Sequence, residues 1–288
     1  MAPDLNDAKS LWRSFKSPEF WAEISPSSHI SDRIDLNPIE PEQPPDLDHF
    51  ALEGFGGAHA VPIHLAERAA RTVSDVYQSG LPTAFALVYD ELWEPARYLF
   101  GHARTLLDSC ELRADGWAWL VPAGETGWAG HRDFFGQSSD ALGHSEILTF
   151  WLALSSVTDD DAAMVVVPRS RDPHWPDSMA NAPDPSLGLT LTGDPGDVFF
   201  WDGDVYHWSS QGTSSQRGPR ISAAYTFAAR TGLDIKPPLD PNSFGLERRL
   251  DVAARGIIDY YYRLTAVPPA LLEWALRWNR AAGFLQQP

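Results

Sequence analysis

Short apolar runs separated by turn residues follow one another through the middle of the chain, from Trp117 to about Ala229. Runs of this length, bounded by Gly, Pro, Asp and Ser, are typical of β-strands. The last run alternates: Arg220, Ser222 and Ala224 share one face, and the large apolar side chains share the other. The pattern predicts strands within 117–122, 147–154, 163–168 and 195–203, one beginning at His207, and one at 220–229.

Helical spacing is confined to the two ends of the chain. The apolar positions of residues 63–77 recur every three to four residues, which predicts a helix, and a second helix is expected over about 91–109. Further helices are expected over 5–24 (short and amphipathic), 250–264 and 269–284. Residues 50–55 are expected to form a first short strand, closed by Gly56-Gly57. Residues 25–48, rich in Pro, Ser and Asp, predict an extended strap.

These elements predict one mainly β domain with flanking helices. We expect residues 1–48 to form an N-terminal helix and strap, and residues 49–235 to form the sheet domain with its supporting helices. Residues 236–288 are expected to form a helical extension packed on the same domain. A chain of 288 residues is long enough to bury one large core.

The segment Gly130-His131-Arg132-Asp133 carries the first chemical signal. Residues i and i+2 of a β-strand point to the same side, so His131 and Asp133 are expected to project together. A second imidazole from His207, on a later strand, completes two histidines and one carboxylate. That ligand set, with the opposite positions open, is typical of non-haem ferrous oxygenases. His144-Ser145-Glu146 is a rival pair, but it lies directly against the strand at 147–154.

Arg220 carries the second signal. An arginine on the inner face of a small barrel is costly unless it meets an anion, and a carboxylate satisfies its planar fork with two hydrogen bonds. Arg217 competes for this role, but it lies in the polar turn before the strand, whereas the apolar strand continues directly from Arg220.

In the order and spacing of these motifs, the chain resembles the phytanoyl-CoA dioxygenase-like (PhyH) family of iron(II)/2-oxoglutarate oxygenases, over roughly residues 117–230. The resemblance rests on Gly-His-Arg-Asp at 130–133, the strand at 147–154, the acidic turn at 157–161, the strand at 163–168 and the His207…Arg220 element. One departure is Pro168-Arg169-Ser170-Arg171, where the family often has Pro-Gly-Ser-His. The resemblance implies a double-stranded β-helix, the cupin-like jelly roll.

The resemblance also implies roles for individual residues. His131, Asp133 and His207 would be the iron ligands, and Arg220 would anchor the distal carboxylate of 2-oxoglutarate. The other cosubstrate residues implied are Ser222, Ser209 and Trp151. Apart from the resemblance, Trp117 and Trp119 share one strand face and would line either the substrate pocket or the barrel core. One of Phe134 and Phe135, directly after the metal motif, is expected near the substrate, and Arg132 would meet a substrate carboxylate or phosphate or lie at the surface. Because halogenases of this mechanistic class lack the carboxylate ligand, Asp133 predicts that this chain does not halogenate.

The charge and composition of the chain disfavour several classes of binding partner. The formal net charge is −17, which disfavours nucleic acid and anionic membrane surfaces. Cys110 is the single cysteine, so no intrachain disulfide is expected. The first residues lack the pattern of a signal peptide, and no stretch has the roughly 18 apolar residues of a membrane span. We therefore expect a cytoplasmic protein. The oligomeric state is not readable from the sequence.

The expected activity is hydroxylation of an unactivated C–H bond of a small molecule, either a specialised metabolite or an amino-acid-like compound. Fe(II) would be the cofactor, and 2-oxoglutarate and O₂ would be consumed as cosubstrates, with release of succinate and CO₂. Desaturation, epoxidation or cyclisation would need the same oxidant. Two other hypotheses are a non-catalytic cupin-like protein that binds a small molecule or metal, and an oxygenase that does not use 2-oxoglutarate.

Overall fold

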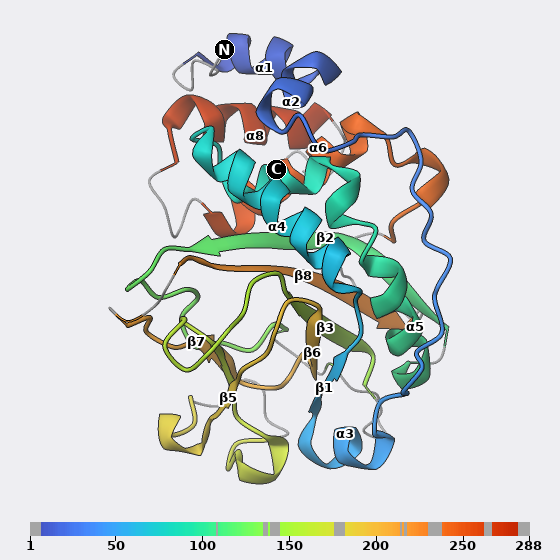
Figure 1. Cartoon of the computed structure of the whole chain (residues 1–288), viewed down its shortest axis with the longest axis vertical. Helices are drawn as coiled ribbons and strands as arrows, with labels where there is room; N and C mark the ends of the chain where they lie inside the picture. The colour runs from blue at the N-terminus through green and yellow to red at the C-terminus, as the bar shows by residue number, and fades with distance from the viewer. Residues whose placement is uncertain are drawn as a thin grey trace.

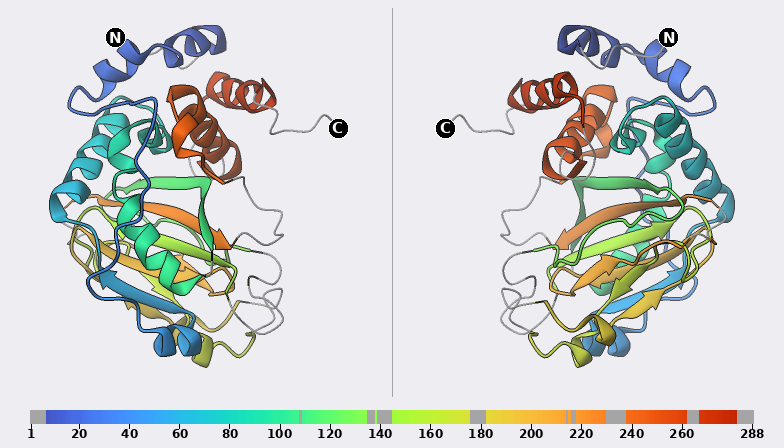
Figure 2. Two further views of the ribbon diagram at one scale, coloured as in Figure 1. Left: turned by 90° about the vertical axis from the view of Figure 1, so that its right-hand side faces the viewer. Right: turned by 90° about the vertical axis from the view of Figure 1, so that its left-hand side faces the viewer.

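The computed structural model describes residues 7–107, 109–134, 138, 145–175, 182–213, 215, 218–229, 238–261 and 267–281. Its centre is a pair of antiparallel sheets (Figures 1 and 2). The larger sheet has the strand order β1 (Phe55–His59), β6 (Asp197–Asp202), β3 (Ile147–Ala153), β8 (Arg220–Ala229) and β2 (Cys110–Val121). The smaller sheet has the order β5 (Leu189–Leu191), β4 (Met164–Val166) and β7 (His207–Ser209).

Alternation along the strands divides the interior into two apolar cores. On β8, Ile221, Ala223, Tyr225 and Phe227 join the core shared with the helices. Ala224 of the same strand joins a second core, in which side chains of both sheets meet. The two-residue period of a strand therefore works as expected: one face of the larger sheet is covered by helices, and the other faces the smaller sheet. The functional side chains lie on this second face.

The helical layer covers the larger sheet and draws on both ends of the chain (Figure 1). The α-helices of this layer are α1 (Ala8–Phe15), α2 (Pro18–Ile24), α4 (Ile63–Gln78), α5 (Ala96–Leu106), α6 (Leu246–Gly256) and α8 (Pro269–Ala281). The short helix α3 (Leu47–Glu53) lies beside β1. The 3₁₀ turns are η1 (Thr83–Val88), η2 (Asp90–Leu92), η3 (Arg169–Arg171), η4 (Pro185–Leu187) and η5 (Pro241–Ser243), and η6 (Ile257–Tyr261) is π-helical. The segment between α2 and α3 runs along the outside of the molecule, as expected for the strap (Figure 1).

Several predicted elements differ from the structure. The strand expected from 117 begins at Cys110, and the helix expected over 250–264 is α6 followed by the π-helical η6. Three further differences have a visible local cause. The strand expected over 50–55 is displaced: α3 occupies residues up to Glu53, and β1 begins only at Phe55 and includes Gly56 and Gly57, which were expected to close the strand. The helix begins after Asp46, whose side chain accepts a hydrogen bond from His49 N, and ends at Gly54 in the left-handed region. The single helix expected over 5–24 is divided at Ser17, which caps α2, with Pro18 at its first position. The second central helix begins at Ala96 rather than near 91, because η2 precedes it. The expected antiparallel sheets with flanking helices are present, but the expectation of a mainly β domain is wrong in its proportions, because about 39% of the structure is helix and 23% is strand.

The N-terminal and C-terminal helices pack against each other. The rings of Trp12 and Trp278 are 4.9 Å apart, and those of Phe15 and Trp274 are 4.8 Å apart. Arg249 of α6 is fully buried and donates to the backbone carbonyls of Phe244, Val88 and Ser31. The three-part division of the chain stays a prediction. In the described part of the chain, no helix is long and apolar enough to cross a membrane.

His102 of α5 predicts an acid sensitivity of the fold. It is 4% exposed, and burial lowers its pKa below the ordinary 6.5. Because the unfolded chain then binds more protons than the folded one, the free energy of unfolding should fall as the pH drops below 6.5. His102→Leu should flatten this loss between about pH 6.5 and 5, whereas His64→Leu on the exposed face of α4 should not. Urea titrations at several pH values measure both; equal slopes in the two variants would refute the prediction.

Candidate active site

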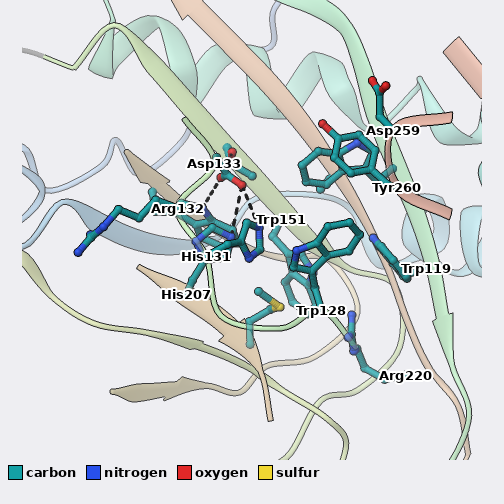
Figure 3. Close-up of a pocket in the computed structure, with 15 residues that line it drawn as sticks. Trp119, Trp128, His131, Arg132, Asp133, Trp151, His207, Arg220, Asp259 and Tyr260 are labelled. Atoms are coloured by element: carbon teal, nitrogen blue, oxygen red, sulfur yellow. Dashed lines mark hydrogen bonds and ion pairs between the residues drawn. The ribbon is translucent and has the colours of Figure 1, made fainter. Parts of the chain in front are cut away.

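Two histidines and one aspartate meet beneath the larger sheet (Figure 3). His131 pairs with His207 through two backbone hydrogen bonds, N to O distances of 3.0 and 2.9 Å, and Asp133 N donates to Gly203 O at 3.1 Å. The expected continuous strand through His131 and Asp133 is absent; His131 forms an isolated bridge. The bridge still places the side chains of His131 and Asp133 next to the His207 side chain on β7. The ligand atoms of the three residues lie within 4.8 Å of one another.

The backbone fixes which nitrogen each imidazole presents. His131 Nδ1 lies 2.8 Å from Ala129 O, and His207 Nδ1 lies 2.9 Å from Val205 O. Since a carbonyl only accepts, both Nδ1 atoms must donate, and in the neutral rings Nε2 keeps its lone pair. The Nε2 atoms of both rings lie 3.4 Å from Asp133 Oδ1. Three electron-pair donors therefore converge on one point.

Asp133 uses one carboxylate oxygen for structure and leaves the other for a ligand. Its Oδ2 accepts hydrogen bonds from Thr149 Oγ1 at 2.6 Å and from Trp201 Nε1 at 2.9 Å. Its buried Oδ1 has no hydrogen-bond partner among the described residues. Burial raises the pKa of Asp133, but attraction to the two imidazoles in their protonated form, and the hydrogen bonds that these then donate, outweigh burial and hold the pKa well below its ordinary value. The carboxylate is therefore ionised.

This donor set fits a divalent metal ion. Two imidazole nitrogens and one carboxylate oxygen are ligands that non-haem iron accepts, and each ligand is oriented by a second hydrogen bond. A buried carboxylate oxygen without a donor is costly unless a cation meets it. Within the described residues, His131, Asp133 and His207 form the one group of His, Cys, Asp or Glu close enough to hold a metal.

Arg220 lies apart from the three triad residues in the same site, and we call the triad and Arg220 the two poles of the site (Figure 3). It is 2% exposed, and burial lowers its pKa to about 10, so it remains a cation at neutral pH. Its guanidinium donates to Ser222 Oγ at 2.7 Å and to Ser209 Oγ at 3.3 Å, and lies over the Trp151 ring. Its Nε has no hydrogen-bond partner, and no carboxylate among the described residues pairs with it. The site can therefore take an anion.

A cavity of about 300 Å³ joins the two poles. Its walls are rich in Trp and Tyr, and they include all three triad residues together with Trp117, Trp119, Trp128, Thr149, Trp151, Met164, Trp201, Arg220, Ala224, Asp259 and Tyr260. Ser209 and Ser222 are absent from this lining, so they contact Arg220 rather than the cavity. Trp117, Trp119 and Trp151, all named from the sequence, line this cavity.

Two expected substrate residues are turned elsewhere. Arg132 touches the cavity, but its guanidinium points away and pairs with Asp172 at 2.7 Å (Figure 3). Phe134 packs against Gly203, whose missing Cβ leaves room for the ring, and does not line the cavity. Arg169 is likewise buried, 2.9 Å from Asp202. Phe135, Arg217 and His144 lie outside the described residues.

Several cavity residues were not predicted from the sequence. Thr149 lies two positions before Trp151 on β3, so the two-residue period would have found it. Trp201 and Trp128 flank the ligand segments without a motif of their own. Asp259 and Tyr260 come from η6, which reaches the cavity from the C-terminal helical region, and no periodic pattern in the sequence points there.

Arg132 predicts an effect on metal binding through its neighbours. Its side chain is 4% exposed and donates to Asp172 and to Asp204 O, which anchors the backbone between the two ligands of its segment. Arg132→Leu is expected to weaken metal affinity by about 10–100-fold, as removal of groups behind a metal ligand does. Titration with Mn(II) measures it, with Arg171→Leu on the exposed surface as the control. Unchanged affinity in a folded Arg132→Leu protein would exclude this positioning role.

The fold and site together place a candidate metal site of two histidines and one aspartate in an antiparallel sheet protein. Residues 48–222 match the phytanoyl-CoA dioxygenase (PhyH) family. Since the match spans more than half of the chain, the protein belongs to this family, whose members are non-haem iron, 2-oxoglutarate-dependent oxygenases. The family match begins well upstream of residue 117, where the sequence resemblance was expected to start.

Solved structures show the same fold. The apo form of the non-haem monooxygenase ThoJ is 15% identical with a TM-score of 0.52, and the similarity covers 82% of this chain and 99% of that one. SnoN, a non-haem α-ketoglutarate-dependent epimerase from nogalamycin biosynthesis, is 18% identical with a TM-score of 0.50, covering 67% and 91%. At these identities the likeness concerns the fold alone. The sequence matches no curated protein.

Proposed function

We propose that this protein is an Fe(II)/2-oxoglutarate-dependent dioxygenase that hydroxylates an unactivated C–H bond of a small molecule, on a double-stranded β-helix scaffold. One observation carries the proposal: among the described residues, a single cavity holds both a carboxylate oxygen without a hydrogen-bond partner, facing two imidazole nitrogens, and a buried arginine that pairs with no carboxylate. The first requires a cation and the second requires an anion. A metal ion and a dicarboxylate satisfy both.

The residues divide the work of binding between them. His131, Asp133 and His207 would hold the iron, while Thr149 and Trp201 keep the carboxylate in place. When bound, ferrous iron and 2-oxoglutarate would together activate O₂: one oxygen atom would enter succinate as CO₂ is released, and the other would be available to oxidise the substrate.

At the other pole, Arg220, held by Ser222 and Ser209, would bind the far carboxylate of 2-oxoglutarate with two hydrogen bonds. The aromatic walls exclude water and so strengthen the polar contacts made inside the cavity. Desaturation, epoxidation and cyclisation use the same oxidant, and substrate placement alone decides between them and hydroxylation.

Succinate release tests the proposal. The protein is incubated with Fe(II), ascorbate, 2-oxoglutarate and O₂, with and without a library of small molecules, and succinate is quantified by mass spectrometry. We expect slow release without a substrate, faster release with a matching one, and none from His131→Ala. Absence of succinate from protein that demonstrably holds both iron and 2-oxoglutarate would favour the non-catalytic, cupin-like alternative.

A further inference from the structure

We propose that the substrate of this cavity is a small organic cation, an amine that is protonated or quaternary. The inference deepens the proposed function, because it assumes that the metal and the dicarboxylate occupy the triad and Arg220. It rests on the remaining part of the cavity, which we call the aromatic compartment: Trp117, Trp119, Trp128, Tyr260 and Asp259.

The aromatic compartment is a continuous set of ring contacts beside the metal site. Trp119 and Trp128 have ring centroids 5.7 Å apart, Trp128 and Tyr260 5.4 Å, and Tyr260 and Trp117 4.7 Å, all in edge-to-face arrangement. Trp128 also lies 5.5 Å from the His131 ring, so the compartment adjoins the metal ligands. Ring faces attract cations, and Trp and Tyr do so most strongly.

The charges of the cavity are separated. Figure 3 shows Asp259 and Tyr260 on the side of the cavity away from Arg220, with the triad lying apart from both. A dicarboxylate bound between the triad and Arg220 neutralises the cationic pole. Among the described lining residues, the acidic side chain at the aromatic end is Asp259. A ligand in this end therefore meets a carboxylate and ring faces, both of which favour positive charge.

The described lining offers little to an anionic substrate. Its two arginines are Arg220, at the cosubstrate pole, and Arg132, whose guanidinium is paired with Asp172. The chain as a whole has 39 acidic and 22 basic residues besides histidine. An excess of negative charge of this size draws cations toward a cleft and repels anions. Local and overall charge thus agree.

Two further features fit a ligand at this place. Trp117 Nε1 is buried and has no hydrogen-bond partner among the described residues, so an oxygen acceptor on the ligand would satisfy it. Asp259 and Tyr260 lie in η6, a π-helical turn that follows directly on α6. Single π-turns within helices are uncommon and occur frequently at functional sites.

Binding of matched probe pairs tests the proposal. Choline is compared with 3,3-dimethylbutan-1-ol, its uncharged isostere, and benzylammonium with benzyl alcohol and benzoate. Affinities are measured by titration calorimetry on the full chain, both metal-free and loaded with Mn(II) and 2-oxoglutarate. We expect at least one ammonium probe to bind at least tenfold more tightly than its neutral partner in the loaded protein, and benzoate to bind no better than benzyl alcohol.

Variants locate the preference. Asp259→Asn should weaken the preferred ammonium probe about fivefold and leave its neutral partner unchanged, with exposed Asp48→Asn as the control. Trp128→Leu should weaken the ammonium probe by about 2–30-fold, whereas Trp175→Leu, outside the cavity, should not. The difference between charged and neutral probes separates this role from a general loss of structure.

The outcomes separate the two proposals. Neutral or anionic probes that bind as well as the ammonium probes, or no binding of either ammonium probe, would overturn the cationic substrate. If Mn(II) and 2-oxoglutarate bind in that same experiment, the proposed function still stands. If neither Mn(II) nor 2-oxoglutarate binds but the metal-free protein keeps the ammonium preference, the proposed function fails, and the assignment of a cation to the aromatic compartment stands.

Discussion

Arg220→Met is expected to abolish the binding of 2-oxoglutarate while leaving the ligand-free fold as stable as the wild type or more so. Arg220 is a buried cation whose neighbours among the described residues are two hydroxyls and a ring, so it bears a desolvation cost that only an anion offsets. Removing one partner of a buried charge pair costs about 2–5 kcal/mol, which corresponds to a loss of 2-oxoglutarate affinity of at least about 30-fold. An apolar side chain of similar length removes the cost to the empty protein.

Thermal unfolding with and without 2-oxoglutarate, in the presence of Mn(II), measures both effects. The wild type should gain stability from 2-oxoglutarate, and Arg220→Met should not. Arg248→Met, at an exposed position of α6, is the matched control and should respond like the wild type. A variant that still gains stability from 2-oxoglutarate would transfer the anchor role to another arginine, Arg217 first.

Asp133→Asn is expected to lose the metal and, with it, all oxidative turnover. The amide keeps the size of the side chain but removes the charge that faces the two imidazole nitrogens. Since changes behind a ligand already cost about 10–100-fold in metal affinity, loss of the ligand itself should exceed about 100-fold. Metal content after dialysis and Mn(II) titration measure it. Asp159→Asn, in an exposed turn, should retain the wild-type affinity.

A second result is expected from the same titration. His207→Ala should lose the metal as completely as Asp133→Asn, because the triad has no spare ligand among the described residues. Near-normal affinity in either variant, in protein shown to be folded by circular dichroism, would contradict the ligand set.

Much of the site follows from the sequence because strands transmit position through a simple rule. The two-residue period of β8 places Arg220 and Ser222 on one face and Tyr225 on the other, as the alternation predicts. The relation between His131 and Asp133 also follows, although an isolated bridge, not a strand, maintains it. The sequence pattern therefore predicts side-chain positions where strand pairing fixes the face to which each side chain points.

The remainder depends on contacts between distant segments. Arg132 reads as a substrate residue from its place between two ligands, yet a carboxylate 40 positions later turns it away from the cavity. Tyr260 reaches the site from a helical region more than 120 residues beyond His131 and lies against Trp128. Helix α3 occupies most of the strand expected over 50–55. The side chain of Asp46 caps the start of this helix, and Gly54, in the left-handed region, ends it.

The central claim is that one cavity binds ferrous iron and 2-oxoglutarate together, and anaerobic visible spectroscopy tests it most directly. A 2-oxo acid chelated to iron in such a triad gives a weak charge-transfer absorption in the visible range. The account predicts that absorption in the wild type, its loss in His131→Ala and its weakening in Arg220→Met. Wild-type protein that binds iron but shows no such absorption with 2-oxoglutarate would contradict the account.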